Sequence, residues 1–193
     1  MELDEAELVR RSQGGDLGAF NSIVERYQGL VFNLSARILG NRASAEDAAQ
    51  ETFISAYRSI GGFRGGSLRA WLSRIAANAS RDLIRKRRRR PEESLDEAQE
   101  EVGFQVASTA AGPEQQAILG ELGSEIQRGI LSLPDDQRAV LVLIEVQWFI
   151  YEETAEAVAT SVGTVKSRLS RARARVRDYL MQRRELLPDT FRR

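Results

Sequence analysis

The stretch that decides the fold is YEETAEAVATSVGTVKSRLSRARARVR, residues 151–177. It reads as a short helix over about 151–159, a tight turn, and a long basic helix that runs from Val162 to about Arg184. This order is typical of a helix-turn-helix. In such a unit the second helix enters the major groove of DNA and the first helix braces it. The stretch therefore predicts a DNA reader in the C-terminal part of the chain.

The side chains of the long helix divide into faces when each residue turns by about 100°. One apolar stripe, which we expect to face the core, holds Val162, Val165, Leu169, Ala172 and Val176. Ala174 lies opposite this stripe, among small polar residues and arginines that can read base edges. Ser161 suits the N-cap. The expected DNA contacts are Ser161, Thr164, Lys166, Ser167, Arg168, Arg171 and Arg175. An amphipathic surface helix that binds protein remains the alternative.

Composition limits the classes of function. The 193 residues include no Cys and no His, which removes thiolate nucleophiles, cysteine zinc sites and the usual general base. We therefore expect a protein that is not an enzyme and that has no metal site and no cofactor. There is no apolar run of membrane-spanning length, and Met1–Arg10 is acidic without an apolar core, so we expect no signal peptide and no membrane insertion. The lack of Cys fits a cytoplasmic location.

The net charge of zero hides two basic islands. Residues 81–90 hold seven basic residues and one acid, and residues 166–177 hold six basic residues and no acid. Two nearly single-signed islands in a neutral chain indicate two local contacts with a polyanion. A pair of solvated helix faces is the alternative.

The remaining pattern predicts an all-α protein with two small helical domains joined by a linker. In residues 1–90 we expect a helical block over 4–39, a helix over about 44–60 with a Ser44–Asp47 capping box, and a helix capped by Ser67. Glycines flank the loop between the last two helices. Residues 91–113 hold few large apolar side chains and read as a flexible linker. Residues 114–193 hold a helix over about 114–131, a break at Leu133-Pro134, a second helix and the helix-turn-helix.

Four segments resemble the extracytoplasmic-function sigma factors of bacterial RNA polymerase, of the sigma-E kind. They are SVGTVKSRLSRAR (161–173), LPDDQRAVL (133–141), AEDAAQETF (45–53) and the stretch from FR (63–64) through WLSRIAAN (71–78). The recognition helix alone also resembles some response-regulator output domains. The resemblance implies a region 2-like domain over 1–90 and a region 4-like domain over 114–193. Its implied partners are the clamp helices and flap of core polymerase, promoter DNA and an anti-sigma factor.

The resemblance also assigns roles to residues of the first domain. Polymerase binding falls to Asp47, Gln50, Glu51 and Phe53. Capture of the downstream element as single-stranded DNA falls to Phe63, Arg64, Trp71, Arg74, Asn78, Arg81, Arg85 and Lys86. Without the resemblance, Asp47 and Glu51 would indicate only a helix face that is exposed to solvent. The spacing of Trp71 with Leu68 and Ile75 equally predicts a core position.

The chain departs from the family pattern at Trp148, Ile150 and Ala159. Small residues, often Gly, are usual at the first and last of these positions, and a capping Ser or Thr at the second. Residues 148–150 can form an exposed apolar patch for a partner, or they can fill the core. Two other functions stay open on the residues alone: a stand-alone helix-turn-helix regulator with a ligand-binding first domain, and a metal-dependent nucleic-acid enzyme that uses the acids near Asp47.

Overall fold

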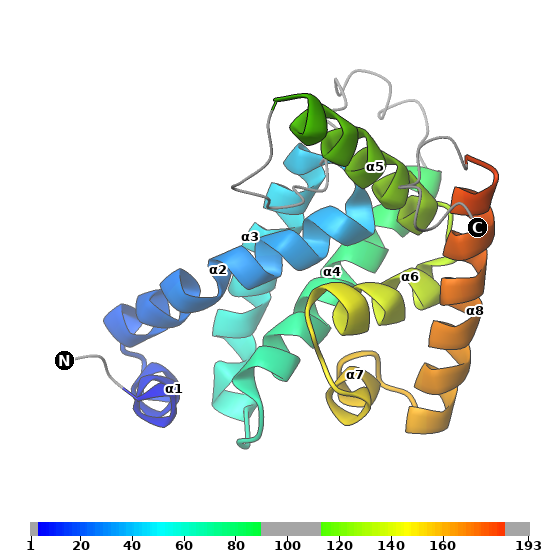
Figure 1. Cartoon of the computed structure of the whole chain (residues 1–193). Coiled ribbons are helices and arrows are strands. Elements are labelled where there is room, and N and C mark those ends of the chain that lie inside the picture. Colours follow the sequence, from blue (N-terminus) through cyan, green and yellow to red (C-terminus); the bar gives the residue numbers. More distant parts are fainter. Residues whose placement is uncertain (1–3, 90–112, 184–193) are drawn as a thin grey trace.

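A computed structural model of the chain describes residues 4–89 and 113–183, and every described element is helical (Figure 1). The linker expected at 91–113 lies outside these ranges, except for its last residue. The N-terminal elements are α1 (Glu5–Gln13), α2 (Leu17–Leu39), α3 (Arg42–Ser59), the short helix η1 (Ile60–Gly62) and α4 (Leu68–Arg89). The C-terminal elements are α5 (Pro113–Leu131), α6 (Asp135–Leu141), the π-helical turn η3 (Val142–Val146), α7 (Tyr151–Ala157) and α8 (Val162–Met181).

The structure differs from the helices expected in the first domain at two places. The block over 4–39 is broken at Gly14-Gly15, and Asp16 caps α2 by accepting the Ala19 N–H at 3.0 Å. The next helix begins at Arg42 because Asn41 caps it: the Asn41 carboxamide oxygen accepts the Ser44 N–H at 2.9 Å. Ser44 is therefore buried inside the first turn and makes no capping box with Asp47.

Two other expected caps are confirmed. The Ser67 hydroxyl accepts the Ala70 N–H at 3.1 Å, which holds the start of α4 after the glycine-flanked loop. The Ser161 hydroxyl accepts the Thr164 N–H at 3.2 Å and so fixes the start of α8. Each cap satisfies an N–H group that the helix itself leaves without a partner.

Each half of the chain packs around apolar side chains from several helices. In the first half α2, α3 and α4 pack together around Leu34, Ile38 and Leu72. In the second half α6 and α7 pack on α8. The predicted apolar stripe of α8 is confirmed: Val165, Leu169 and Ala172 are buried, and Val162 and Val176 lie partly buried against the core.

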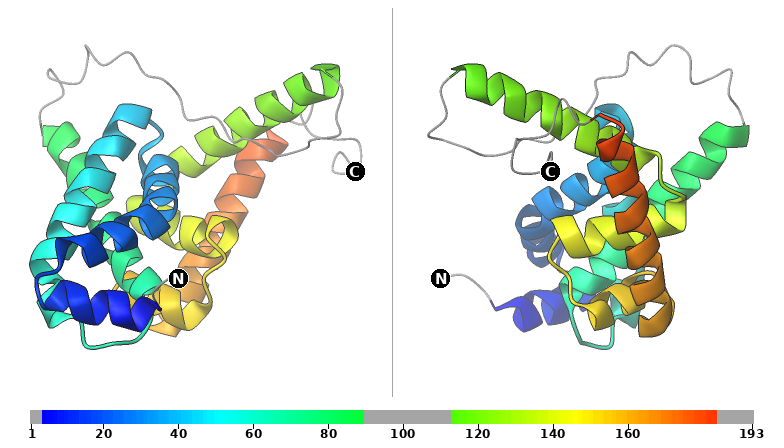
Figure 2. Two further views of the ribbon diagram at one scale, coloured as in Figure 1. Left: turned by 90° about the vertical axis from the view of Figure 1, so that its left-hand side faces the viewer. Right: turned by 45° about the vertical axis from the view of Figure 1, so that its right-hand side comes forward.

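The two halves also contact each other, which Figure 2 shows for α4 beside α7 and for α2 beside α5. Arg138 of α6 is only 7% exposed at this contact. Its guanidinium donates to the carbonyl of Ile38 at 2.8 Å and to those of Leu131 and Leu133 at 2.5 and 2.9 Å. A cation thus meets the carbonyl ends of α2 and α5, where the helix dipoles favour it. Burial lowers the pKa of Arg138, and the nearby Asp135 opposes that shift.

Candidate nucleic-acid interface

The outward face of α8 presents Ser167, Arg171 and Arg175 to solvent. Among the described residues, Arg171 and Arg175 have no ion-pair or hydrogen-bond partner. The Ser161 and Thr164 hydroxyls lie 2.9 Å apart, and the Ser167 hydroxyl donates to the Thr164 carbonyl at 2.9 Å. The face therefore combines two long cations with small hydroxyls near the N-terminus of the helix. This combination suits contact with base edges in the major groove.

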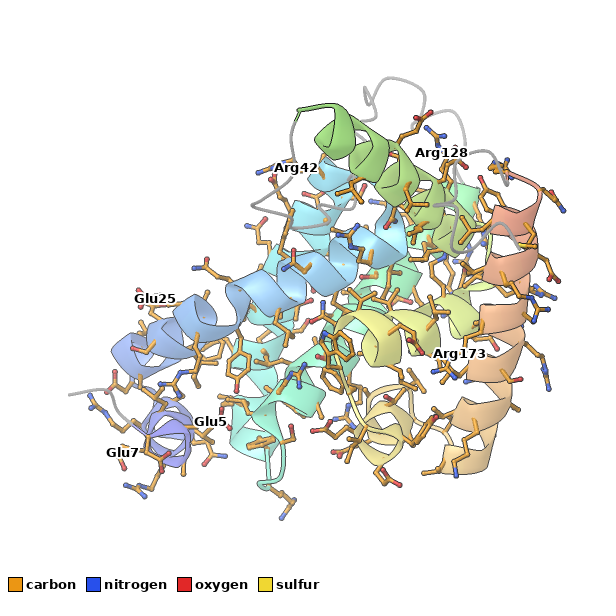
Figure 3. The ribbon with its side chains drawn as sticks, in the orientation of Figure 1. Glu5, Glu7, Glu25, Arg42, Arg128 and Arg173 are labelled. Atoms are coloured by element: carbon orange, nitrogen blue, oxygen red, sulfur yellow. The ribbon has the colours of Figure 1, made fainter. Side chains whose placement is uncertain are left out.

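Acceptors on neighbouring elements hold the cations that flank this face. Lys166 lies 5.4 Å above the ring of Tyr151 in α7. The Arg173 Nε donates to the Glu145 carboxylate at 2.9 Å, and Arg173 is labelled in Figure 3. The Arg168 Nε lies 3.0 Å from the Asp136 carboxylate. These contacts fix the flanking cations in place, while Arg171 and Arg175 are left to reach a ligand.

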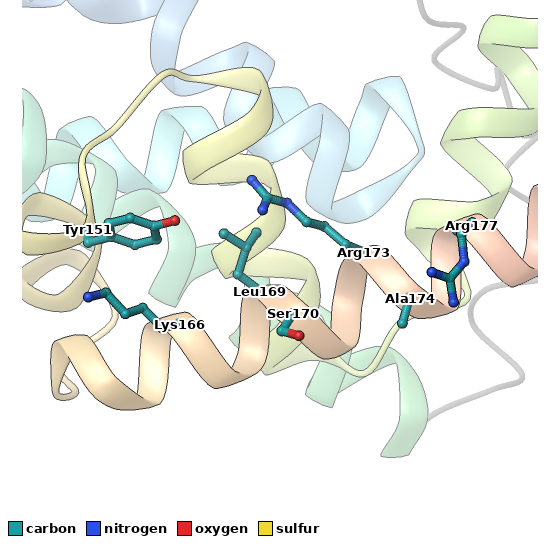
Figure 4. A pocket seen from close by; sticks show the side chains of 7 residues that line it. All are labelled: Tyr151, Lys166, Leu169, Ser170, Arg173, Ala174 and Arg177. Carbon is teal, nitrogen blue, oxygen red and sulfur yellow. The ribbon is translucent and has the colours of Figure 1, made fainter. Parts of the chain in front are cut away.

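An open groove of about 460 Å³ runs along one flank of α8 (Figure 4). Its lining residues are Tyr151, Lys166, Leu169, Ser170, Arg173, Ala174 and Arg177. Three cations on one side of a helix suit a row of phosphates. The sequence analysis missed Tyr151 and Ser170 as part of this surface, and it counted Arg177 in the basic island without naming it among the expected DNA contacts. The spacing could have shown Arg177, because it lies four residues after Arg173 on the same helix face.

The second basic island lies on the C-terminal half of α4. Arg85 and Lys86 are exposed and line an open groove of about 590 Å³ with Asp82 and Arg89. Arg85 lies 3.5 Å from Asp82 of the same helix.

Within the same helix, the Arg81 guanidinium donates to the Asn78 carboxamide oxygen, so these two predicted residues lie together. Arg74 is half-buried, one helical turn before Asn78. The predicted residues of α4 therefore do not all form one exposed row.

Of the two predicted aromatic contacts, Phe63 lies in the loop before α4 and Trp71 lies near the start of α4. Trp71 is 8% exposed, and its ring centroid lies 5.3 Å from that of Phe63, which is half-buried. The Gln13 carboxamide donates to the Phe63 carbonyl at 2.8 Å and so ties the loop to α1. Trp71 therefore occupies the core position that its spacing also allowed. Arg64 is exposed between the glycines.

The acidic face of α3 is exposed to solvent, as the spacing predicts. Asp47, Gln50 and Glu51 are exposed, whereas Phe53 turns inward and is half-buried against the core. The same face continues with two exposed apolar side chains, Ile54 and Tyr57, which the sequence analysis missed. A step of seven residues from Asp47 to Ile54 was the available signal.

Two of the three atypical residues of the helix-turn-helix share the same backbone conformation. Trp148 (φ 58°) and Ala159 (φ 50°) are the two described non-glycine residues with left-handed backbone. Of the apolar run, Trp148 and Ile150 are exposed, whereas Phe149 is 3% exposed and fills the core. Both expectations for residues 148–150 are thus partly met. The Glu153 carboxylate still accepts the Ile150 N–H at 3.2 Å, so half of a capping box survives.

A model of Sigma-70 region 2 matches residues 23–90, and a model of Sigma-70 region 4 matches residues 124–176. The chain is 37% identical over 171 residues to the RNA polymerase sigma-H factor of Pseudomonas aeruginosa, covering 86% of this chain and 89% of that protein. It is 38% identical over 184 residues to the ECF RNA polymerase sigma-E factor of Haemophilus influenzae, covering 93% and 96%. The chain belongs to the extracytoplasmic-function sigma factors.

Two solved structures share this fold. The sigma factor RpoE from Bartonella quintana, in complex with the anti-sigma factor NepR, matches with a TM-score of 0.63 and 26% identity, covering 83% of this chain and 96% of that one. CnrH, in complex with the cytosolic domain of CnrY, matches with a TM-score of 0.62 and 26% identity, covering 90% and 94%. In this sigma factor the region 2 match spans α2 to α4, and the region 4 match includes α6, α7 and most of α8.

None of the described helices is long and apolar enough to cross a lipid bilayer. Within residues 4–89 and 113–183, no cluster of three or more acidic side chains is placed to hold a metal ion.

Proposed function

We propose that this sigma factor is a non-enzymatic specificity subunit that acts in the cytoplasm and directs core RNA polymerase to particular promoters. The first domain binds the polymerase clamp through α3 and holds the opened downstream element along α4. The second domain reads the upstream duplex element with α8. The observation that carries this proposal is the exposed basic surface in each of the two sigma-70 regions, one on α4 and one on α8. Two weak contacts on one chain reinforce each other through their effective concentration.

We also propose that an anti-sigma factor controls this protein. Of two solved structures with the same fold, one is a complex of a sigma factor with the anti-sigma factor NepR, and the other is a complex of CnrH with the cytosolic domain of CnrY. The exposed Ile54 and Tyr57 on α3 and the exposed Trp148 and Ile150 before α7 offer apolar contacts on both domains.

Run-off transcription with bacterial core polymerase tests the main proposal. Adding the protein is expected to produce specific initiation on templates that core polymerase alone does not transcribe. Glu51→Arg should abolish that gain, because it reverses charge on the exposed face of α3. Glu25→Arg, an equal change on the exposed face of α2, should leave it intact. Promoter binding without polymerase and no initiation with it would instead identify a stand-alone regulator.

Measurements of duplex binding can distinguish the residues of α8 that contact bases from those that contact phosphates. Arg171→Ala should weaken binding to the cognate upstream element by about 1–3 kcal/mol and leave binding to unrelated duplexes nearly unchanged, as expected of a base contact. Lys166→Ala should weaken binding to all sequences and reduce the salt dependence by about one phosphate contact. Fluorescence anisotropy at several salt concentrations measures both. Equal losses on all sequences for Arg171→Ala would assign that residue to phosphate.

A further inference from the structure

Gln13, the last residue of α1, holds the backbone of the loop that leads into α4. Its carboxamide nitrogen donates to the Ile60 carbonyl at 3.1 Å and to the Phe63 carbonyl at 2.8 Å. The Phe63 N–H donates to the same Ile60 carbonyl at 3.0 Å and so closes η1. A carboxamide has two N–H groups, so Gln13 uses both of them on one turn of the loop.

The helix that carries Gln13 is itself fixed to α2 at both ends. Near its start, the Tyr27 hydroxyl of α2 donates to the carboxylate of Glu5, which is labelled in Figure 3. At its end, the Arg11 Nε donates at 2.8 Å to the carboxylate of Asp16, the N-cap of α2. Figure 2 shows α1 packed on α2, and α1 also contacts η1. Gln13 therefore reaches the loop from a firmly held support.

The loop itself has little conformational restraint. Residues 61–66 include four glycines, and Gly65 and Gly66 have φ of 95° and 88°. A Cβ added at any of the four would meet no atom within 4 Å, so a ligand can approach the backbone closely. Glycine loses more conformational entropy on ordering than any other residue. Ligand binding would include that entropic cost unless another contact had already ordered the loop.

An unpaired base can contact this segment in two ways. Stacking on Phe63, or a contact between Arg64 and a phosphate, tolerates any sequence. Hydrogen bonds from the open loop backbone to a base edge distinguish one base from another, and they depend on where the backbone groups lie. The Phe63 ring is also supported from behind by Trp71, at 5.3 Å between centroids. Releasing the loop should therefore weaken discrimination between bases more than it weakens overall binding.

We propose that Gln13 is a positioning residue for base recognition in the opened downstream element. It holds residues 61–66 in the conformation that receives an extruded base. The expected DNA contacts do not include any residue of α1, and α1 precedes the residues that match Sigma-70 region 2. The inference rests on the proposed function, because a base becomes unpaired at this loop only when polymerase opens the promoter.

Run-off transcription on a set of substituted templates tests this role. The set starts from one template on which core polymerase and the native chain initiate, and it replaces each base pair of the opened downstream element in turn. Gln13→Met keeps the length of the side chain but has no N–H donor. It should reduce the preference between bases by about three- to tenfold at the position that the loop reads, as expected for one hydrogen bond. Preferences in the upstream element, which α8 reads, should stay the same.

Two further variants separate the hydrogen bonds from other effects of the substitution. Gln13→Lys restores N–H donors at the end of a long side chain and should keep most of the native preference. Gln28→Met, the same substitution on the exposed face of α2, should leave the preference intact. An equal decline on every template with Gln13→Met would show that Gln13 only stabilises the fold. That result, or unchanged preferences at every downstream position, would overturn the inference.

Tryptophan fluorescence measures the hold on the loop without DNA. The chain has two tryptophans, so Trp71 is the only one in a Trp148→Phe background. Gln13→Met should make Trp71 more accessible to quenching by acrylamide, because Phe63 is then free to leave its ring, whereas Gln28→Met should not. Unchanged quenching would overturn the inference. If quenching rose but the native chain supported no initiation, the proposed function would fail and the hold of Gln13 on the loop would stand.

Discussion

Ala159 and Trp148 each place a side chain on left-handed backbone, where L-residues other than Gly are disfavoured. Ala159 lies in the turn between α7 and α8, and its N–H donates to the Glu156 carbonyl at 3.2 Å. Family resemblance identified both positions as departures from a glycine-like pattern. The sequence could not show that the turn keeps its left-handed geometry without the glycine, because that geometry is imposed by packing of α7 and α8.

Replacing Ala159 with Gly should relieve this strain. We expect Ala159→Gly to raise the free energy of unfolding by about 1 kcal/mol. Urea denaturation followed by circular dichroism measures it. The matched control is Ala6→Gly on the exposed face of α1, which should lower the same free energy by about 0.5–1 kcal/mol because its backbone is helical. A destabilising Ala159→Gly would show that the turn does not adopt the left-handed conformation in solution.

At the scale of single helices, periodicity predicted what α8 buries but not what its exposed cations contact. Spacing alone predicted that Val165, Leu169 and Ala172 are buried. It also predicted that Asp47, Gln50 and Glu51 share an exposed face. The partners of Arg168 and Arg173 are Asp136 and Glu145, from other elements, and no local pattern brings them together. The start of α3 was misplaced because Asn41 and Ser44 are both good caps, and burial of Ser44 decided between them.

The start of α7 offers an element-scale test. Ile150 stands at the N-cap without a polar side chain, while Glu153 already accepts its N–H. Ile150→Ser should complete the capping box and raise the free energy of unfolding by about 1 kcal/mol. Ile150→Ala removes the same apolar surface without adding a hydroxyl, so thermal and urea denaturation should show no comparable gain. If both substitutions gave the same change, the hydroxyl would not cap α7.

At the scale of the whole molecule, composition and motifs predicted two domains and a linker, but not that the domains dock. The clearest sign of docking is at Gly40, the left-handed C-cap of α2 (φ 74°). A Cβ at Gly40 would lie 2.4 Å from Cδ1 of Leu131, at the end of α5. The sequence shows a helix-ending glycine at this position. It does not show that a leucine 91 positions later packs against it, because this contact depends on how the domains meet.

A double-mutant cycle between Gly40 and Leu131 tests this docking in solution. Gly40→Ala should lower the free energy of unfolding by about 1–2 kcal/mol, through backbone strain and displacement of Leu131. The cost should fall by about 0.5 kcal/mol or more in a Leu131→Ala background, since residues in contact couple. Gly15→Ala is the matched control: its φ is 89°, but no atom lies within 4 Å of the new Cβ. Gly15→Ala should therefore lower the free energy of unfolding through backbone strain alone, without any coupling to Leu131. If Gly40→Ala also showed no coupling to Leu131, α2 and α5 would be separate in the free protein. The arginine contacts between the domains would then not form either.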